Sequence, residues 1–255
     1  MKAVACLLCG ADDKRQIVSG RDRDFPQNTQ LYTIYACNRC GLVYLTPRPD
    51  TPEELAEIYP FEYDSYMKES QRFLIALRRL AWRPELREII RLTGANSPIL
   101  EVGCATGEFL ASLRAGGRTN VQGLEFSPRA AEVAQRRHGI PVCSGELLES
   151  HFPDAAFDLV VMRHVLEHVP DPYTTLSEIR RILRPGGRCI FTIPNIESHT
   201  ARLFGPDWYG HQIPRHFYAF PHRPLALLLR RAGLEPESIT YIAAPNIWIG
   251  SVRFW

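Results

Sequence analysis

The sequence predicts an α/β fold in which a parallel sheet carries helices on both faces, with a small cysteine module ahead of it. Three observations predict this class: apolar strand-like runs alternate with helical segments from residue 99 onward, a turn of small residues joins the first of these strands to the first helix, and two Cys-x-x-Cys pairs lie in the first 45 residues. Alternating strands and helices of these lengths build a parallel sheet that is covered on both faces.

Length and composition fit one domain of ordinary size with a small appendage. The chain has 255 residues, of which 45% are hydrophobic, so a sizeable core can form. Charged residues make up 23% and the formal net charge is +2, which requires neither nucleic acid nor an anionic membrane as a partner. No apolar run reaches the roughly 18 residues that cross a bilayer, and the start of the chain lacks the features of a signal peptide. We therefore expect a cytoplasmic protein with reduced thiols; its oligomeric state stays open.

Prolines and cysteines divide the chain into three expected parts. These are a four-cysteine module at residues 1–46, a linker and helical lead-in at residues 47–95, and the main domain at residues 96–255. Three prolines in residues 46–52 block regular structure. A short helix is expected to start at Pro52 with Thr51 as its cap. Residues 70–92 have helical spacing of apolar residues, with a break expected near Pro84.

The main domain shows the alternation of strands and helices in detail. Strands are expected at residues 99–103, 121–126, 140–143, 157–163, 187–194 and 238–243. Helices are expected at residues 107–116, 128–138, 172–184 and 222–232. Ligands of such sheets bind beyond the carboxyl ends of the strands, near the switch in strand order.

The cysteines of the N-terminal module have the spacing of a metal site. Cys6 and Cys9 form one Cys-x-x-Cys-Gly turn, and Cys37 and Cys40 form a second. Each turn presents two thiolates, and two turns complete a tetrahedral Zn²⁺ site, which would be structural because four thiolates leave no open position. A redox dithiol is the alternative, but such motifs occur singly and precede a helix. A zinc ribbon that binds nucleic acid is a further alternative, and it would need a basic stripe.

The remaining three cysteines are single residues in strand-like stretches. They are expected to be small buried residues: Cys104, Cys143 and Cys189.

The turn after the first strand of the main domain has the composition of a ligand loop. In Ile99–Leu110, ILEVGCATGEFL, Gly103 allows a sharp turn, and Ala105 and Gly107 leave room for a ligand against bare backbone. The spacing is not Gly-x-Gly-x-x-Gly, and no Lys-Ser or Lys-Thr follows, which disfavours a phosphate site. Glu101 lies inside the motif, where a carboxylate would repel pyrophosphate and suit a cationic ligand.

A second acidic residue follows at the end of the next strand. Glu125 ends the run Val121–Glu125, about 20 positions after the small-residue turn. A carboxylate at such a strand tip accepts hydrogen bonds from both hydroxyls of a ribose. The alternative is a solvated glutamate at a strand end, and the pairing with the upstream motif favours the ribose role.

Four stretches of the main domain together resemble the class I S-adenosylmethionine (SAM)-dependent methyltransferases, in the small-molecule branch that includes the ubiquinone-biosynthesis O-methyltransferases. They are ILEVGCATGEFL (99–110), VQGLEFSP (121–128), FDLVVMRHVLEHVPDP (157–172) and LRPGGRCIFTIPN (183–195). The resemblance implies a Rossmann-like sheet, SAM as the cofactor and S-adenosylhomocysteine (SAH) as its product. It also implies a C-terminal hairpin, for which residues 238–243 and 247–255 are the candidates.

The resemblance implies roles for residues at the methionine end of the cofactor. Glu101 would contact the methionine amine, and Gly103, Ala105 and Gly107 would line the methionine and the sugar. Two residues after the fourth strand would border the methionine end: Arg163 and His164.

Further residues are implied for the nucleoside end. Glu125 would hold the ribose hydroxyls, with Phe126 against the adenine. Glu146, where the family often carries aspartate, and its neighbour Leu147 lie in the loop after the third strand and would contact the adenine.

Methyl transfer to a hydroxyl needs alignment and a base that removes the proton. His168 follows His164 by four residues and is one candidate base. The alternative is that Glu167 and His168 cap or brace the following helix. Residues 204–218, rich in aromatic residues, glycine and histidine, form a candidate lid over the acceptor. In this lid we expect a catalytic base, Arg215 to bind an anionic group, and aromatic rings to stack on a sugar or ring. The alternative is that the segment is a well-packed loop with buried aromatic residues. The candidate bases and rings of this segment are His216, His211, Trp208 and Tyr209.

The acceptor is expected to be a small molecule. N-terminal cysteine modules recur in methyltransferases that resemble those of surface-polysaccharide and deoxysugar pathways, which favours a sugar hydroxyl or a glycan precursor. The alternatives are methylation of a quinone or polyketide ring, a SAM-binding protein without catalysis, and methylation of RNA or protein guided by the zinc module.

Overall fold

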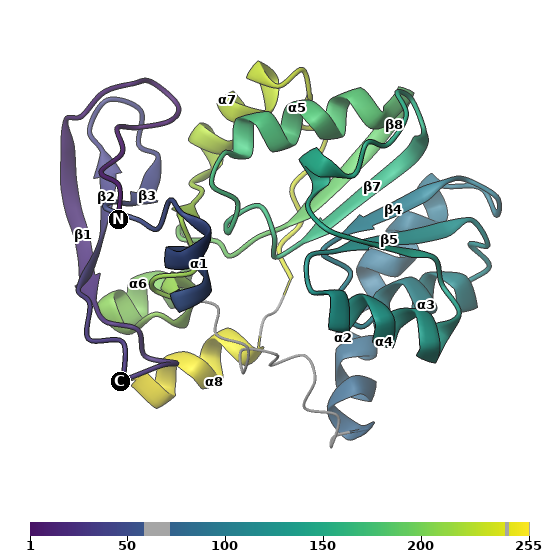
Figure 1. Cartoon of the computed structure of the whole chain (residues 1–255), viewed down its shortest axis with the longest axis horizontal. Coiled ribbons are helices and arrows are strands. Elements are labelled where there is room, and N and C mark those ends of the chain that lie inside the picture. Colours follow the sequence, from purple (N-terminus) through teal and green to yellow (C-terminus); the bar gives the residue numbers. More distant parts are fainter. Residues whose placement is uncertain (59–71, 243–244, 255) are drawn as a thin grey trace. The chain divides into compact units, whose positions relative to one another are not determined.

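The computed structural model of the chain describes residues 1–58, 72–242 and 245–254 (Figure 1). These fall into two compact units. The first comprises Met1–Phe61, Leu166–Thr174 and Ile193–Trp255, and the second comprises Glu62–Val165 and Thr175–Thr192. The two units are described separately.

The second unit is built on a five-stranded parallel sheet with the order β6-β5-β4-β7-β8. Its strands are β4 Ile99–Val102, β5 Val121–Glu125, β6 Val142–Ser144, β7 Phe157–Arg163 and β8 Leu183–Thr192. All four residues of β4 are buried, as expected for a central strand covered on both faces. The strand order turns back between β4 and β7, which is where such sheets bind their ligands.

Helices cover both faces of this sheet (Figure 1). They are α2 Arg72–Leu92, α3 Glu108–Ala115, α4 Pro128–His138 and α5 Pro172–Ile182, with a short 3₁₀ helix, η3, at Leu147–Glu149. Local signals fix α4 well: the Ser127 side chain accepts a hydrogen bond from the N–H of Ala130, and Gly139 ends the helix with φ of 59°. The predicted parallel α/β sheet is therefore confirmed.

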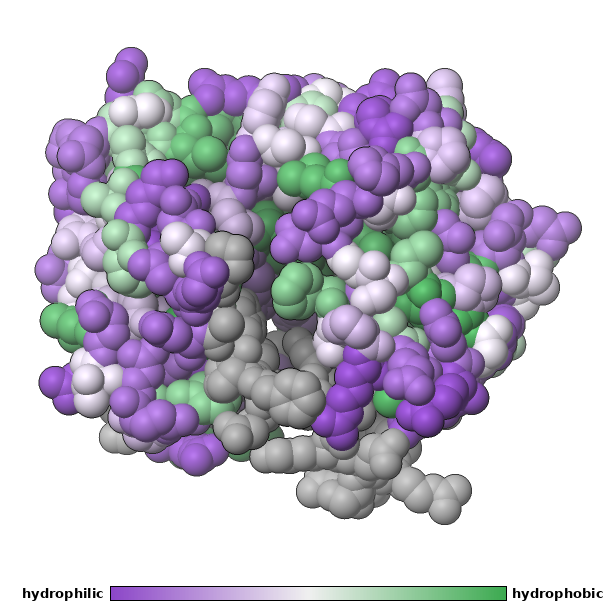
Figure 2. All heavy atoms as spheres, in the orientation of Figure 1, coloured by the Kyte–Doolittle hydropathy of each residue, from purple (hydrophilic) through white to green (hydrophobic). Residues whose placement is uncertain are grey.

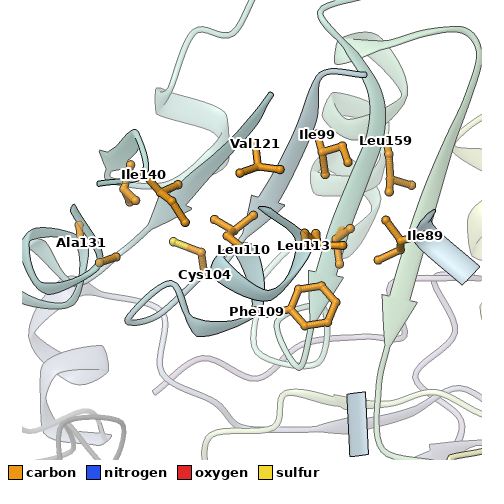
Figure 3. Packing of buried hydrophobic residues seen from close by; sticks show 13 residues of the cluster. Ile89, Ile99, Cys104, Phe109, Leu110, Leu113, Val121, Ala131, Ile140 and Leu159 are labelled. Atoms are coloured by element: carbon orange, nitrogen blue, oxygen red, sulfur yellow. The ribbon is translucent and has the colours of Figure 1, made fainter. Parts of the chain in front are cut away.

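The core of this unit lies between the sheet and α3. In Figure 3, Phe109, Leu110 and Leu113 of α3 lie against Ile99 and Val121 of the two central strands. A Cβ at Gly123 would come within 2.4 Å of the Cys104 sulfur, so the tight packing of α3 requires glycine in β5. Of the three single cysteines, Cys104 is buried as predicted, Cys189 is half-buried and Cys143 is exposed, so the prediction is wrong for Cys143.

The expected break near Pro84 is wrong, because α2 continues through it. Trp82 and Leu86 on either side of the proline pack against the core cluster, and Ile89 one turn further is fully buried. Tertiary packing on both sides therefore outweighs the hydrogen bond that the proline removes.

The first unit contains a four-stranded antiparallel sheet with the order β1-β2-β3-β9. Its strands are β1 Lys14–Gly20, β2 Tyr32–Cys37, β3 Val43–Leu45 and β9 Tyr218–Ala219. The last strand comes from the far end of the chain: Tyr44 pairs with Tyr218 and Val43 with Ala219. The sheet of the cysteine module is thus completed by a segment outside residues 1–46.

The remaining elements of this unit are helical. They are α1 Pro52–Ile58, α6 His199–Phe204, α7 His222–Arg231 and α8 Pro245–Phe254, with 3₁₀ turns η4 Gly205–Asp207 and η5 Tyr209–His211. The predicted start of α1 is confirmed, since the Thr51 hydroxyl accepts a hydrogen bond of 3.3 Å from the N–H of Glu54. The face of the molecule in Figure 2 mixes hydrophilic and hydrophobic residues. None of the described helices combines the length and apolar character of a membrane span.

The expected C-terminal hairpin is wrong. Residues 238–242 form no strand, and α8 occupies the position of the second arm. Pro245 suits the first position of a helix, and packing holds the rest of α8 in place. The Ser251 hydroxyl, fully buried, accepts a 2.9 Å hydrogen bond from the N–H of Tyr209, and Trp248 packs edge-on against Phe204.

Candidate cofactor site and catalytic histidines

The loop between β4 and α3 has an unusual backbone. Gly103, Ala105 and Gly107 have φ of 73°, 48° and 77°, all in the left-handed region. A Cβ at Gly103 would lie 2.4 Å from Val165, and one at Gly107 would lie 2.9 Å from Ala134, so both positions require glycine. Ala105 adopts this conformation at an energetic cost, which is typical of loops that hold ligands.

Glu125 holds this loop in place. One carboxylate oxygen accepts a 2.8 Å hydrogen bond from the N–H of Ala105, and the other accepts a 3.0 Å bond from the N–H of Ser127. The neighbouring Phe126 side chain is 70% exposed, and an exposed ring at the end of a strand offers a stacking surface.

Glu101 is a buried carboxyl group in the centre of the sheet. It is 3% exposed, and its Oε2 has no hydrogen-bond partner among the described residues. Burial raises the pKa of Glu101 to about 8, while the positive charge of Arg163 acts in the opposite direction. An unsatisfied buried oxygen is costly. A cationic group such as the ammonium of a methionine moiety would satisfy it, so the residues present fit SAM.

Two further predicted residues end the neighbouring strand β7. The Arg163 guanidinium donates to Glu85 at 3.1 Å and lies over the ring of Phe109 at 4.2 Å, so contacts within the protein hold it. His164 is exposed and has φ of 55°, and its N–H donates to the Thr192 carbonyl at 2.7 Å. The strained backbone therefore occurs on two adjacent strand ends, after β4 and after β7.

The loop after β6 carries the last two predicted cofactor residues. The N–H of Gly145 donates to the Glu125 carbonyl at 3.0 Å, which places this loop beside the end of β5. Glu146 is exposed and Leu147 is 7% exposed. All ten predicted cofactor residues thus belong to one unit and lie in β4 or at the carboxyl ends of four strands. Their individual roles stay predictions.

The two predicted bases lie together in the other unit. The rings of His168 and His216 meet edge-on with their centroids 4.6 Å apart. Nδ1 of His168 lies 3.1 Å from the Arg215 carbonyl, and Nδ1 of His216 lies 2.8 Å from the Gly210 carbonyl. One oxygen of Glu167 and one ring nitrogen of each histidine lie within 4.8 Å of one another.

These carbonyl contacts decide the tautomers. A backbone carbonyl can only accept a hydrogen bond, so Nδ1 carries the proton in both rings. In the neutral imidazole, Nε2 is then the acceptor, the state that a general base requires.

Of the alternative that Glu167 and His168 cap or brace the following helix, the structure contradicts the capping. Asp171 caps α5, accepting hydrogen bonds from the N–H groups of Tyr173 at 3.0 Å and Thr174 at 3.2 Å. The Glu167 backbone carbonyl instead accepts from the N–H of Phe217 at 2.8 Å, which ties the His168 segment to the His216 segment.

The expected acceptor lid is largely a packed loop. Arg215, predicted to bind an anionic group, has a fully buried side chain that pairs with Asp22, so that prediction is wrong. Trp208 is 2% exposed and packs edge-on against His211, which is itself buried. Trp208 therefore offers no open face for stacking. Sequence analysis missed the role of Asp22, because its partner Arg215 lies far along the chain and no local pattern links the two residues.

The four N-terminal cysteines come together as predicted. Their sulfurs lie within 4.8 Å of one another, with Cys6 and Cys40 at 3.4 Å and Cys9 and Cys37 at 3.5 Å, and all four are free thiols. A tetrahedron with Zn–S bonds of about 2.3 Å puts the sulfurs roughly 3.8 Å apart. The donor set and its spacing therefore fit Zn²⁺.

Comparisons with known proteins define the class. The family model of a methyltransferase domain matches residues 70–239, more than half of the chain. The chain therefore belongs to this family and is a class I SAM-dependent methyltransferase, as the sequence motifs predicted.

Individual relatives give further detail. A ubiquinone biosynthesis O-methyltransferase from Thiobacillus denitrificans is 33% identical over 159 residues, 57% of this chain and 68% of that protein. A demethylmenaquinone methyltransferase from Bacillus licheniformis is 30% identical over 131 residues, 49% of this chain and 54% of that protein. A solved SAM-dependent methyltransferase from Thermotoga maritima, described as a possible histamine N-methyltransferase, has a TM-score of 0.55 and 28% identity, covering 71% of this chain and 82% of that one.

Proposed function

We propose that this methyltransferase transfers the SAM methyl group to a ring hydroxyl of a quinone-type aromatic acceptor. The similarity to a ubiquinone biosynthesis O-methyltransferase over 68% of that protein carries the proposal. The similarity to a demethylmenaquinone methyltransferase supports the same class of ring. The sugar acceptor expected from the cysteine module has no counterpart among these relatives, so it becomes an outcome of the test.

The proposed cofactor site uses the carboxyl ends of β4 to β7. Bound SAM supplies a methyl group on a positively charged sulfur. We assign the methionine ammonium to the unsatisfied oxygen of Glu101 and the ribose hydroxyls to Glu125. Phe126 stacks on the adenine in this assignment. The supporting positions are Gly103, Ala105, Gly107, Glu146, Leu147, Arg163 and His164.

His168 is the proposed base. Its ring is half-buried, whereas His216 is 7% exposed, so His168 is better placed to meet an acceptor. The Arg215 carbonyl fixes the proton on Nδ1 of His168, so Nε2 would take the proton of the acceptor hydroxyl, while SAM would supply the methyl group and leave as SAH. His216 packs edge-on against that ring and restricts its orientation.

The four cysteines are proposed to hold a structural Zn²⁺. Gly10 and Gly41, with φ of 71° and 80°, close the two turns, and each N–H donates to the carbonyl of the first cysteine of its pair. Four thiolates leave no open coordination position for chemistry.

The test measures transfer of labelled methyl from SAM by the purified chain to two acceptors, an ortho-diphenol and a nucleoside-diphosphate sugar. Label in the diphenol product, lost in His168→Ala while SAH binding persists, supports the proposal. Label in the sugar alone would replace the acceptor class. SAH binding with label in neither acceptor, nor in a fractionated cell extract, would contradict an active small-molecule methyltransferase.

A further inference from the structure

A buried ion cluster lies next to the histidine pair, within the same unit. Arg215 and Asp22 have fully buried side chains, and one guanidinium nitrogen donates to both Asp22 oxygens at 2.9 and 2.7 Å. The other terminal nitrogen donates to Asp24 at 3.3 Å. The guanidinium also lies over the Phe25 ring, 5.1 Å from its centroid. Burying full charges is costly, and apolar pairs often stabilise a fold equally well, so a role in fixing geometry accounts better for this cluster.

The Asp22 carboxylate is itself held by its own loop. It accepts hydrogen bonds of 3.0 Å from the N–H groups of both Asp24 and Phe25. The loop after β1 therefore folds around this carboxylate, and the carboxylate in turn fixes where the Arg215 side chain can lie.

Arg215 connects this cluster to the proposed base. Its side chain is clamped by Asp22, its backbone carbonyl accepts from Nδ1 of His168 at 3.1 Å, and its neighbour in the chain is His216. A carbonyl that orients an imidazole must itself be held in place, because the tautomer and ring orientation follow from that one hydrogen bond.

We propose that Asp22 is a positioning residue for methyl transfer: it holds Arg215 so that the Arg215 carbonyl keeps His168 in the Nδ1–H tautomer with Nε2 directed as the base. The inference rests on the proposed function, in which His168 takes the proton of the acceptor. Asp22 makes no contact with the reacting atoms in this scheme and acts only through Arg215.

The test is Asp22→Asn in the full chain, read by steady-state kinetics and by the ¹⁵N ring signals of His168. We expect kcat to fall about tenfold with the KM for SAM unchanged, and the ring signals to shift toward the Nε2–H tautomer. The matched control is Arg23→Gln. Arg23 lies in the same loop and pairs with Asp207 at 2.5 Å, but both side chains are partly exposed, so kcat and tautomer should stay at their wild-type values.

Two further outcomes separate this inference from the proposed function. A tautomer shift without a change in kcat supports the positioning and contradicts His168 as the base. A folded Asp22→Asn with wild-type ring signals overturns the positioning, even if His168→Ala is inactive. Should Asp22→Asn fail to fold, Arg215→Lys provides the test, because it keeps a positive charge beside Asp22 but loses the planar guanidinium that contacts both Asp22 oxygens and Asp24. A smaller shift in the same direction supports the inference, and no shift overturns it.

Discussion

Replacing Glu101 with glutamine should change the pH dependence of stability in a defined direction. Burial raises the pKa of Glu101 from the ordinary 4.5 to about 8. Between these pH values the folded chain holds a proton that the unfolded chain has released. The free energy of unfolding therefore falls as pH rises through this interval, by about 1.4 kcal/mol per pH unit. From pH 5 to pH 8 the loss amounts to roughly 4 kcal/mol.

Glu101→Gln removes this titration, so the variant should be more stable than wild type at pH 8 by about 4 kcal/mol and nearly equal at pH 5. Urea unfolding of both chains without cofactor, at pH 5, 6.5 and 8, measures the difference directly. Histidines that titrate in this range affect both chains alike, so they cancel in the comparison. Unfolding free energies that run parallel from pH 5 to pH 8 would refute the reasoning.

The raised pKa of Glu101 also predicts how the affinity for the cofactor depends on pH. If Glu101 must ionise to receive the ammonium, SAH affinity should rise about tenfold between pH 6 and pH 7 in wild type and stay flat in Glu101→Gln. Titration calorimetry in two buffers of different ionisation enthalpy should show proton release on binding in wild type alone.

Three further substitutions give separate outcomes. His168→Ala should lower kcat by about 10²- to 10⁴-fold with unchanged SAH affinity in calorimetry; normal turnover would exclude it as the base. Cys37→Ser should release zinc, measured by metal analysis, and cost about 4 kcal/mol of unfolding free energy; full stability would argue against a structural metal. Gly103→Ala should lower the free energy of unfolding by roughly 3 kcal/mol, because the new Cβ would lie 2.4 Å from Val165. A smaller loss than that of the control variant Gly117→Ala would disprove the steric argument.

Two of these changes have matched controls in the chain. Cys143 is an exposed cysteine outside the four-sulfur cluster, so Cys143→Ser should keep both zinc and stability. Gly117 has φ of 86° but nothing within 4 Å of an added Cβ, so Gly117→Ala isolates the backbone cost of about 1 kcal/mol. The difference between the two glycine variants measures the clash with Val165.

The unit with the parallel sheet could be predicted from the sequence because the patterns that specify its strands and loops are local. Buried parallel strands form continuous apolar runs, so 99–103, 121–126 and 157–163 were placed within one residue of β4, β5 and β7. The small residues of the loop and the acid at the next strand tip sit at fixed spacings. The positive φ of Gly103 fits the sharp turn that this motif predicts, whereas the positive φ of Ala105 was not predicted.

The unit with the antiparallel sheet could not be predicted in the same way, because strand pairing and ion pairs between residues far apart in the sequence hold it together. β9 is only two residues long and exists because Tyr44 and Val43 pair with it. Asp22 and Arg215 give no sign of their partnership in sequence. Residues 238–243 alternate like a strand, yet packing of α8 on Phe204 and Tyr209 determines that end of the unit. Tertiary contacts override local propensity at each of these places.

Strand β9, which completes the N-terminal sheet, also determines the order in which parts of this chain can fold. During synthesis the two cysteine turns and β1 to β3 leave the ribosome long before β9 does, so β3 presents an open edge until Tyr218 and Ala219 have been made. Assembly of the four-cysteine cluster and closure of the sheet by β9 can therefore be separate events in time. A chain without residues 1–46 would leave β9 without its neighbouring strand, so the cysteine module and the β9 segment form one structural unit.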